Sequence, residues 1–360
     1  MDEITNWQRA TNETILRRLQ QRTCYGEFVN TNSFRASRFL LIIPMLALSC
    51  WSSDSDAQIQ RWGHIEGKVL PQYFWDENYR GSGQGYYVIG MNYYLGNSVK
   101  KDLFKAVENF NIAADRGNSD AQYTLGFIYL NGEWVTQSND KALNYWTLAA
   151  KNNHIKAQML LAQLFADGSM VEQDYRTAAQ WYKKASNAGE VEAKYELGIL
   201  YQQGLGVEQN STKAAKLWKS AVKSGHIESQ AELAYLYYAG EGVAPNIIKA
   251  IKGWHYAAAR GVASAQYNLG FAYENGYGLD QNLYEAFVWY RVAEIEGIPE
   301  AADNCDLLRA KLTEEEFENA KNRARFVHAL IRGKIFREDI TSELVSANVP
   351  EWDDPTLKNR

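Results

Sequence analysis

Few residues in this chain have the types and spacing that catalysis requires, and they do not combine into a site. Ser220 and Lys223 show the S-x-x-K spacing of penicillin-recognising enzymes, and Lys223-Ser224-Gly225 partly matches the K-[ST]-G element of the same enzymes. In those enzymes the second element lies on a distant strand, whereas here both elements overlap in one expected helix. The pattern therefore does not predict a nucleophile with its base.

The chain also shows no spacing typical of a metal site or a disulfide scaffold. Its three cysteines, Cys24, Cys50 and Cys305, are scattered, and its five histidines form no HExxH pair. Its glycine-rich loops join expected helices, so they do not resemble the phosphate-binding loop that follows a strand. We expect no catalytic residue, no metal and no cofactor.

The composition indicates a folded protein and disfavours nucleic-acid binding. Of 360 residues, 46% are hydrophobic, which is enough for a substantial core. The 38 Lys and Arg against 43 Asp and Glu give a net charge of −5, whereas nucleic-acid binders usually carry a basic excess. The 11 tryptophans and 23 tyrosines are many, so the fold must provide places for them.

An internal repeat of 36 residues, present six times, accounts for many of these aromatic residues. The pair Leu125-Gly126 recurs at this interval as a Leu or Ile followed by a Gly or Ala. One column is always aromatic: Phe110, Trp146, Tyr182, Trp218, Trp254 and Tyr290. Another always offers a side-chain acceptor: Asp102, Ser138, Asp174, Asn210, Asn246 and Asn282.

Each repeat predicts two helices that pack against each other. Ala121, Leu125 and Tyr129 form one helical stripe, and Gly126 leaves room for a neighbouring helix. The acceptor column provides the N-cap of the second helix, and a glycine, or Asn153 in one repeat, closes the unit. One hairpin cannot bury its apolar face, so the units must stack. The aromatic column is therefore expected to be core.

These columns resemble the Sel1-like repeat, most clearly from Ala193 to Gly225, with Leu197-Gly198, the loop Gly204-Leu205-Gly206-Val207 and Lys213-Ala214. The resemblance covers roughly residues 85–300. It implies an all-α fold, a right-handed α/α solenoid of six helical hairpins with helical caps, similar to tetratricopeptide repeats. It also implies a non-enzymatic scaffold that binds a protein or peptide.

The first three repeats depart from the family pattern in one loop. The first has Gly96-Asn97-Ser98-Val99, and in the next two Trp134 and Met170 replace the second loop glycine. We expect loops of a different shape there.

The segments beside the repeats are expected to cap them. Residues 58–84, which contain Trp62 and Trp75, form the expected N-terminal cap. Residues 301–332 form the expected C-terminal cap, in which Thr313 to Glu316 has the sequence of a capping box. Residues 333–360 form a tail.

The candidate binding residues follow from the geometry of stacked hairpins, in which the first helices line a concave groove. Two residues of each first helix are expected to point into this groove. One follows the Leu-Gly pair, and the other follows the Tyr or Phe that recurs in every repeat. These residues are Met91, Tyr94, Phe127, Leu130, Gln163, Ile199, Gln202, Tyr235, Tyr238 and Phe271. The alternative is a slightly apolar surface without a ligand, or further packing between helices.

Residues 1–57 are interpreted as an extension with a signal peptide. Arg35 and Arg38 precede an apolar run at 39–49, which is too short to cross a bilayer. A buried core helix is the alternative. Cleavage before a lipidated Cys50 and cleavage before Gln58 both fit the sequence. Membrane contact is expected only through such a lipid anchor or signal peptide.

The function that these observations favour is an exported adaptor of the bacterial cell envelope, in the periplasm, on the outer membrane as a lipoprotein, or secreted. Its expected partner is a protein or peptide rather than a nucleic acid. Two alternatives stay open: an enzyme or enzyme subunit acting on cell-wall material, and a secretory-pathway adaptor similar to the quality-control members of the Sel1 family.

Overall fold

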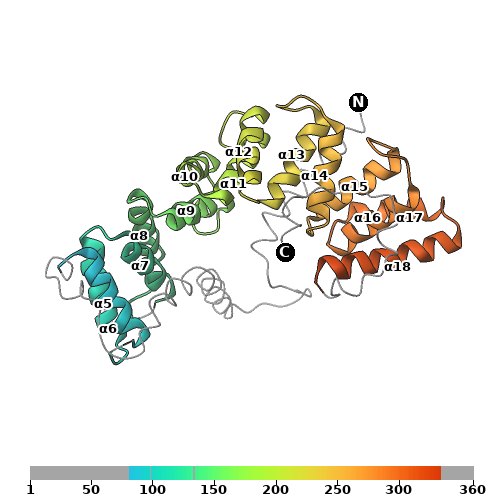
Figure 1. Ribbon diagram of the computed structural model, residues 1–360. Helices are drawn as coiled ribbons and strands as arrows, with labels where there is room; N and C mark the ends of the chain where they lie inside the picture. The colour runs from blue at the N-terminus through green and yellow to red at the C-terminus, as the bar shows by residue number, and fades with distance from the viewer. Residues whose placement is uncertain (1–80, 98, 133, 334–360) are drawn as a thin grey trace. The chain divides into compact units, whose positions relative to one another are not determined.

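The computed structural model describes residues 81–97, 99–132 and 134–333, and within these ranges every regular element is a helix (Figure 1). The predicted signal peptide, Cys50 and most of the expected N-terminal cap lie outside the described residues, as does the tail beyond Gly333. None of the described helices is both long and apolar enough to cross a membrane.

The helices form the six hairpins that the repeat predicts, so the all-α solenoid is confirmed. The first helices are α5 (Gly83–Leu95), α7 (Ser119–Asn131), α9 (Ile155–Asp167), α11 (Val191–Gln203), α13 (Ile227–Ala239) and α15 (Ala263–Asn275). The second helices are α6 (Leu103–Asp115), α8 (Asn139–Lys151), α10 (Tyr175–Asn187), α12 (Ser211–Lys223), α14 (Ile247–Ala258) and α16 (Leu283–Ile295). Two more helices follow, α17 (Glu300–Arg309) and α18 (Glu314–Ile331).

The chain divides into two compact units, with the boundary inside α11. Among the described residues, the N-terminal unit contains the chain up to Ala193 together with residues 205–207. The C-terminal unit contains residues 194–204 and the chain from Glu208 onwards.

Side-chain caps begin all six second helices, as the acceptor column predicts. Each cap oxygen accepts a hydrogen bond from a main-chain N–H two or three residues further on, which satisfies a donor that has no partner inside the helix. The caps are Asp102, Ser138, Asp174, Asn210, Asn246 and Asn282.

The aromatic column forms the core between the two helices of each repeat. None of its six side chains is more than 4% exposed, from Phe110 and Tyr290 at 0% to Tyr182 at 4%. The alanine one turn earlier is fully buried in every repeat: Ala106, Ala142, Ala178, Ala214, Ala250 and Ala286. The packing therefore explains why these positions repeat.

The second loop glycine lies against the helix start of the preceding repeat. A Cβ at Gly206, where φ is +67°, would stand 2.2 Å from the carbonyl carbon of Tyr175. Trp134 keeps the same left-handed conformation, with φ 64°, and its side chain is 68% exposed. The expected change of loop shape is therefore wrong at Trp134, whereas the backbone at Met170 does not adopt a positive φ.

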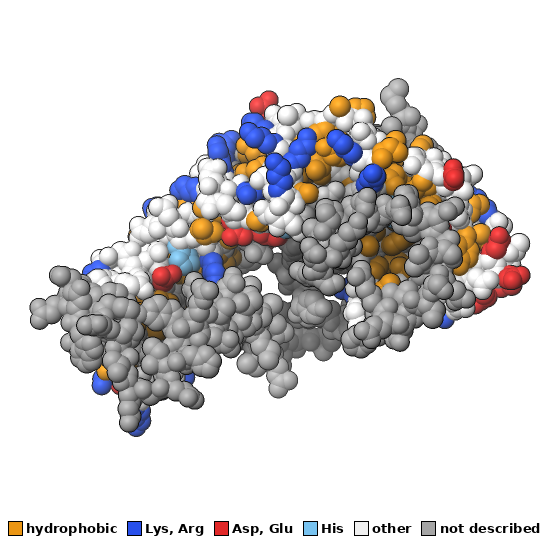
Figure 2. All heavy atoms as spheres, in the orientation of Figure 1, with side chains coloured by type: hydrophobic (Ala, Val, Ile, Leu, Met, Phe, Trp, Pro, Cys, Tyr) orange, Lys and Arg blue, Asp and Glu red, His pale blue; other side chains and the backbone are white. Residues whose placement is uncertain are grey.

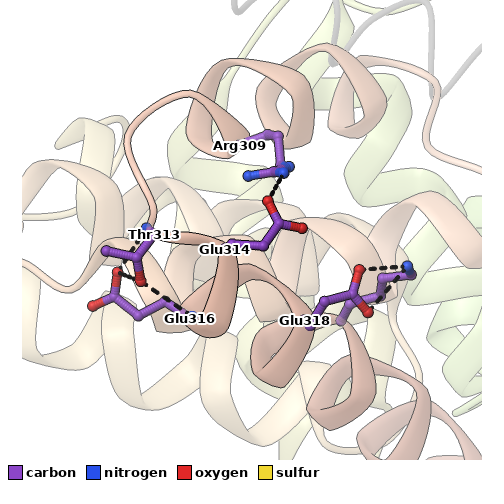
Figure 3. A network of polar contacts seen from close by, with 6 residues as sticks. Arg309, Thr313, Glu314, Glu316 and Glu318 are labelled. Carbon is purple, nitrogen blue, oxygen red and sulfur yellow. Dashed lines mark hydrogen bonds and ion pairs between the residues drawn. The ribbon is translucent and has the colours of Figure 1, made fainter.

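The helices after the sixth repeat cover its end in the C-terminal unit. Ala320 and Ala324 of α18 are fully buried, and the ring of Phe317 lies 5.3 Å from that of Phe287 on α16. The capping box at the start of α18 is formed, since Thr313 and Glu316 exchange side-chain and main-chain hydrogen bonds (Figure 3). Arg309 pairs with Glu314 beside it.

Candidate functional site

The described residues form neither a metal cluster nor the suspected catalytic pair. No group of three or more His, Cys, Asp or Glu within these residues is placed to hold a metal ion. Ser220 and Lys223 lie one turn apart on α12, and Lys223 is exposed to water. A catalytic lysine base is normally dehydrated, so this exposure disfavours the catalytic reading.

In the N-terminal unit the predicted groove residues sit mostly at the edge of the core. Met91 and Tyr94 are half-buried, and the ring of Tyr94 lies 6.4 Å from that of Phe110. Phe127 is half-buried on Trp146, with ring centroids 5.0 Å apart. Leu130 packs on the same core cluster, whereas Gln163 is exposed.

In the C-terminal unit Ile199 and Gln202 differ from the prediction that both side chains point into an open groove. Ile199 is only 5% exposed and belongs to the core cluster that contains Trp218, so it offers no surface to a ligand. Gln202 is half-buried, and its Nε2 donates a hydrogen bond of 2.6 Å to Oε2 of Glu241.

Three aromatic residues of repeats five and six meet at one place, which we call the Tyr277 cluster: Tyr238, Phe271 and Tyr277. Centroid distances are 6.3 Å for Tyr238 and Phe271, 6.0 Å for Tyr238 and Tyr277, and 5.6 Å for Phe271 and Tyr277. Tyr238 also rests on the core residue Trp254, at 5.5 Å. Tyr277 is 43% exposed, so the cluster reaches the surface while its inner side packs on the core.

Tyr277 was missed by the sequence reasoning because it lies in a loop rather than on a first helix. It directly follows Gly276, the C-cap of α15. Glu241 holds the same place one repeat earlier. Tyr238 therefore contacts Tyr277 as Gln202 contacts Glu241, a first-helix residue reaching the loop of the next repeat. This offset between columns is the sequence signal that could have identified Tyr277.

Carboxylates occupy the equivalent places on both sides of the Tyr277 cluster. Burial raises the pKa of the Tyr235 hydroxyl, and the negative charges of Glu241 and Glu232 raise it further. At the other end Glu274 accepts a hydrogen bond of 3.1 Å from Tyr290 and lies 3.5 Å from Lys311. Glu241 thus stands in the column of Tyr277 and Glu274 in that of Tyr238, and the charge of Glu274 is already paired with Lys311.

Comparison with known proteins agrees with this architecture. The model of the Sel1 repeat family matches residues 83–118, 119–154, 155–190, 191–226, 227–262 and 263–294. A protective antigen of uropathogenic Escherichia coli that displays an SLR fold is 25% identical, with a TM-score of 0.56, over 75% of this chain and 60% of the other. This chain thus spans less than two thirds of that relative.

A Sel1 repeat protein from Oxalobacter formigenes is 30% identical over 62% of this chain and 91% of its own, with a TM-score of 0.47. An immunity protein from Pseudomonas aeruginosa is 21% identical over 59% of this chain and 81% of its own, with a TM-score of 0.34. A search of the curated proteins finds no match.

Proposed function

Given that the chain belongs to the Sel1-repeat family, whose repeats are protein–protein interaction modules, we propose that it is a non-enzymatic adaptor that binds a segment of a partner protein at the Tyr277 cluster. Such modules present side chains of stacked helices to a partner, and their specificity depends on the residues that vary between repeats.

The observation that carries this proposal is the aromatic cluster in which the exposed Tyr277 contacts the half-buried Tyr238 and Phe271. Aromatic side chains combine a large apolar area with few rotatable bonds, and tyrosines are enriched among the residues that dominate binding energy. Because the cluster packs on Trp254, its side chains lose little conformational entropy when a partner covers them. The carboxylate of Glu241, in the same column as Tyr277, favours a partner segment that carries Lys or Arg beside its apolar residues.

We place this adaptor in the bacterial envelope, as an exported protein. The support is the sequence of the N-terminal region, where Arg35 and Arg38 precede the apolar run at 39–49.

Selection from a phage-displayed peptide library tests the binding site. Wild-type protein serves as bait, and the dissociation constants of the selected peptides are compared between wild type and Tyr277→Ala. We expect sequences that combine aromatic or large aliphatic residues with Lys or Arg, and at least tenfold weaker binding to Tyr277→Ala, as for the central residue of an interface.

Trp134→Ala is the matched control, because Trp134 is also an exposed loop aromatic but belongs to the N-terminal unit. The selected peptides should bind this variant as they bind the wild type. Equal affinity for wild type and Tyr277→Ala would show that the cluster is not the binding site. Tyr238 and Phe271 are less suitable targets, because both are half-buried against the core.

A further inference from the structure

Six lysines form a basic surface on two second helices of the C-terminal unit, although the whole chain is acidic. We call this surface the lysine face. It consists of Lys213, Lys216, Lys219 and Lys223 on α12 and Lys249 and Lys252 on α14. All six are exposed, and neither helix carries an Asp or Glu. Figure 2 shows Lys and Arg side chains gathered over this part of the molecule.

Three of these lysines also have a place in the packing of the repeats. The Nζ atom of Lys213 lies 5.0 Å from the ring centroid of Tyr201, and that of Lys249 lies 5.1 Å from that of Tyr237. Lys219 lies 5.7 Å from the ring of Tyr237. These cation–π contacts hold the lysine stems along the repeat surface.

The other three lysines, Lys216, Lys223 and Lys252, have no comparable contact. Within the described part of the chain none of them is among the lysines that form an ion pair or lie over an aromatic ring. Lys216 and Lys252 occupy the same position in successive repeats. Unpaired like charges side by side repel each other. Lys223 lies in the last turn of α12, where the helix dipole favours a cation. No such role explains Lys216 and Lys252, to which an anionic partner would be attracted.

We propose that the lysine face binds the surface of an anionic phospholipid bilayer. The charges come from two neighbouring repeats and therefore spread over an area, which suits a planar surface. They are lysines without arginine, and lysine acts as a point charge, whereas arginine is the residue suited to bidentate recognition of phosphates and bases. Ile248, 52% exposed next to Lys249, provides an apolar side chain that can enter the headgroup region.

The rest of the chain favours a membrane over a nucleic acid as the partner. With a net charge of −5 and six positive charges on the lysine face, the remaining residues sum to −5 − 6 = −11. A long polyanion that extended past the face would meet this negative charge, whereas a bilayer need touch only the face. The side chains of the Tyr277 cluster come from α13, α15 and a loop, so none of the six lysines belongs to it, although Gly278 of that loop lies against Ile247 at the start of α14.

Co-sedimentation of the full chain with lipid vesicles tests this proposal. The vesicles contain either phosphatidylcholine alone or an equal mixture of phosphatidylcholine and phosphatidylglycerol. We expect stronger binding to the mixed vesicles in about 0.1 M salt, and loss of this difference in about 1 M salt, where the Debye length falls from about 10 Å to about 3 Å. Arg35 and Arg38 beside the apolar run at 39–49 would also favour the mixed vesicles, so the difference measures all electrostatic binding and the variants must assign it to the face.

Variants assign the effect to the face. In Lys216→Gln/Lys252→Gln the preference for mixed vesicles should fall at least tenfold, since each lysine near an anionic surface contributes about fivefold. Lys100→Gln/Lys156→Gln changes the net charge equally at exposed lysines of the N-terminal unit and should bind as the wild type does. Circular dichroism melts check that both variants fold.

Three outcomes would overturn the proposal: equal binding to both vesicle types, equal loss in both double variants, and binding to random-sequence double-stranded DNA that depends on Lys216 and Lys252 without binding to vesicles. The last outcome would identify the face as a nucleic-acid surface.

Discussion

Trp218 donates a hydrogen bond of 3.1 Å from its indole Nε1 to the main-chain oxygen of Tyr195, across the interface of the two helices in one repeat. The indole can lie this close because Gly198 faces it: a Cβ at Gly198 would stand only 2.3 Å from Nε1. The glycine of the Leu-Gly pair thus makes room for the aromatic residue of the same repeat, and the two positions contact each other.

Repeat five packs its two helices closely with the small residue on the second helix instead of the first. Ala234 replaces the glycine, and the small residue appears on the other helix as Gly253, where a Cβ would stand 2.7 Å from that of Ala234. In this repeat the buried Nε1 of Trp254 has no hydrogen-bond partner. Repeat two, where Gly126 faces Trp146, forms the same bond as repeat four, so both repeats that pair a glycine with a tryptophan have it.

Gly198→Ala should therefore destabilise the protein. Overpacking against Trp218 costs about 1–3 kcal/mol, and displacement of the indole from Tyr195 costs about 1 kcal/mol more, whereas alanine's better helix propensity offsets about 1 kcal/mol, so the net loss is about 1–3 kcal/mol. Ala234→Gly is the matched reverse change; it introduces no clash and should cost about 1 kcal/mol through helix propensity and about 0.8 kcal/mol through the buried methyl group that it removes. Urea unfolding measures both, and an unchanged midpoint for Gly198→Ala would contradict the close contact.

Removal of the core tryptophans should show the value of the indole hydrogen bond. Trp218→Ala is expected to cost about 3–5 kcal/mol, as for other buried tryptophans. Trp254→Ala should cost about 1 kcal/mol less, because Trp254 has no such bond to lose. Thermal and urea unfolding of the two variants give the comparison. A loss below about 1 kcal/mol for Trp218→Ala would mean that the column is not core.

His255 should make the stability fall in mild acid. Its ring is 9% exposed and lies edge-on to those of Tyr273 and Trp289, and burial lowers its pKa from 6.5 to about 4. The folded state therefore binds fewer protons than the unfolded state between these values. The stabilisation is complete above pH 6.5 and decreases as the pH falls toward 4.

Between about pH 7 and about pH 5 this linkage should remove about 2 kcal/mol of stability. Urea unfolding at both pH values measures it in wild type and in His255→Gln, which has no proton to gain. If both proteins lose the same stability, the decrease comes from other groups.

Mass spectrometry of the N-terminus of protein isolated from producing bacteria tests the proposed export. A mature chain that begins at a lipidated Cys50 would establish a lipoprotein, and one that begins at Gln58 would establish a cleaved, soluble form. A chain that retains residues 39–49 would contradict cleavage at either place.

Much of the fold was predictable because every repeat has to meet the same few physical requirements at the same positions. A cap acceptor, a buried alanine and a buried aromatic recur at one interval, and each of these requirements concerns a single hairpin and its neighbour. The caps from Asp102 to Asn282 and the column from Phe110 to Tyr290 are confirmed for this reason.

The candidate site was less predictable because exposure depends on which side chains meet between repeats. Gln163 and Ile199 occupy the same column, yet Gln163 is exposed and Ile199 is buried in a cluster with Tyr195. Tyr277 lies in a loop, and only the contact with Tyr238 shows that it belongs to the site. The place of a residue in the repeat thus gives its position on the helix, whereas the side chains of adjacent helices determine how far it is buried.

Site-specific cross-linking tests the central claim, that a partner segment binds at the Tyr277 cluster, most directly. A photo-reactive amino acid replaces Tyr277 in one protein and Trp134 in a second, and each is irradiated with a labelled peptide selected on the wild type. The account predicts a cross-linked product from position 277 that unlabelled peptide competes away, and none from position 134. Equal labelling at both positions, or labelling from position 134 alone, would contradict it.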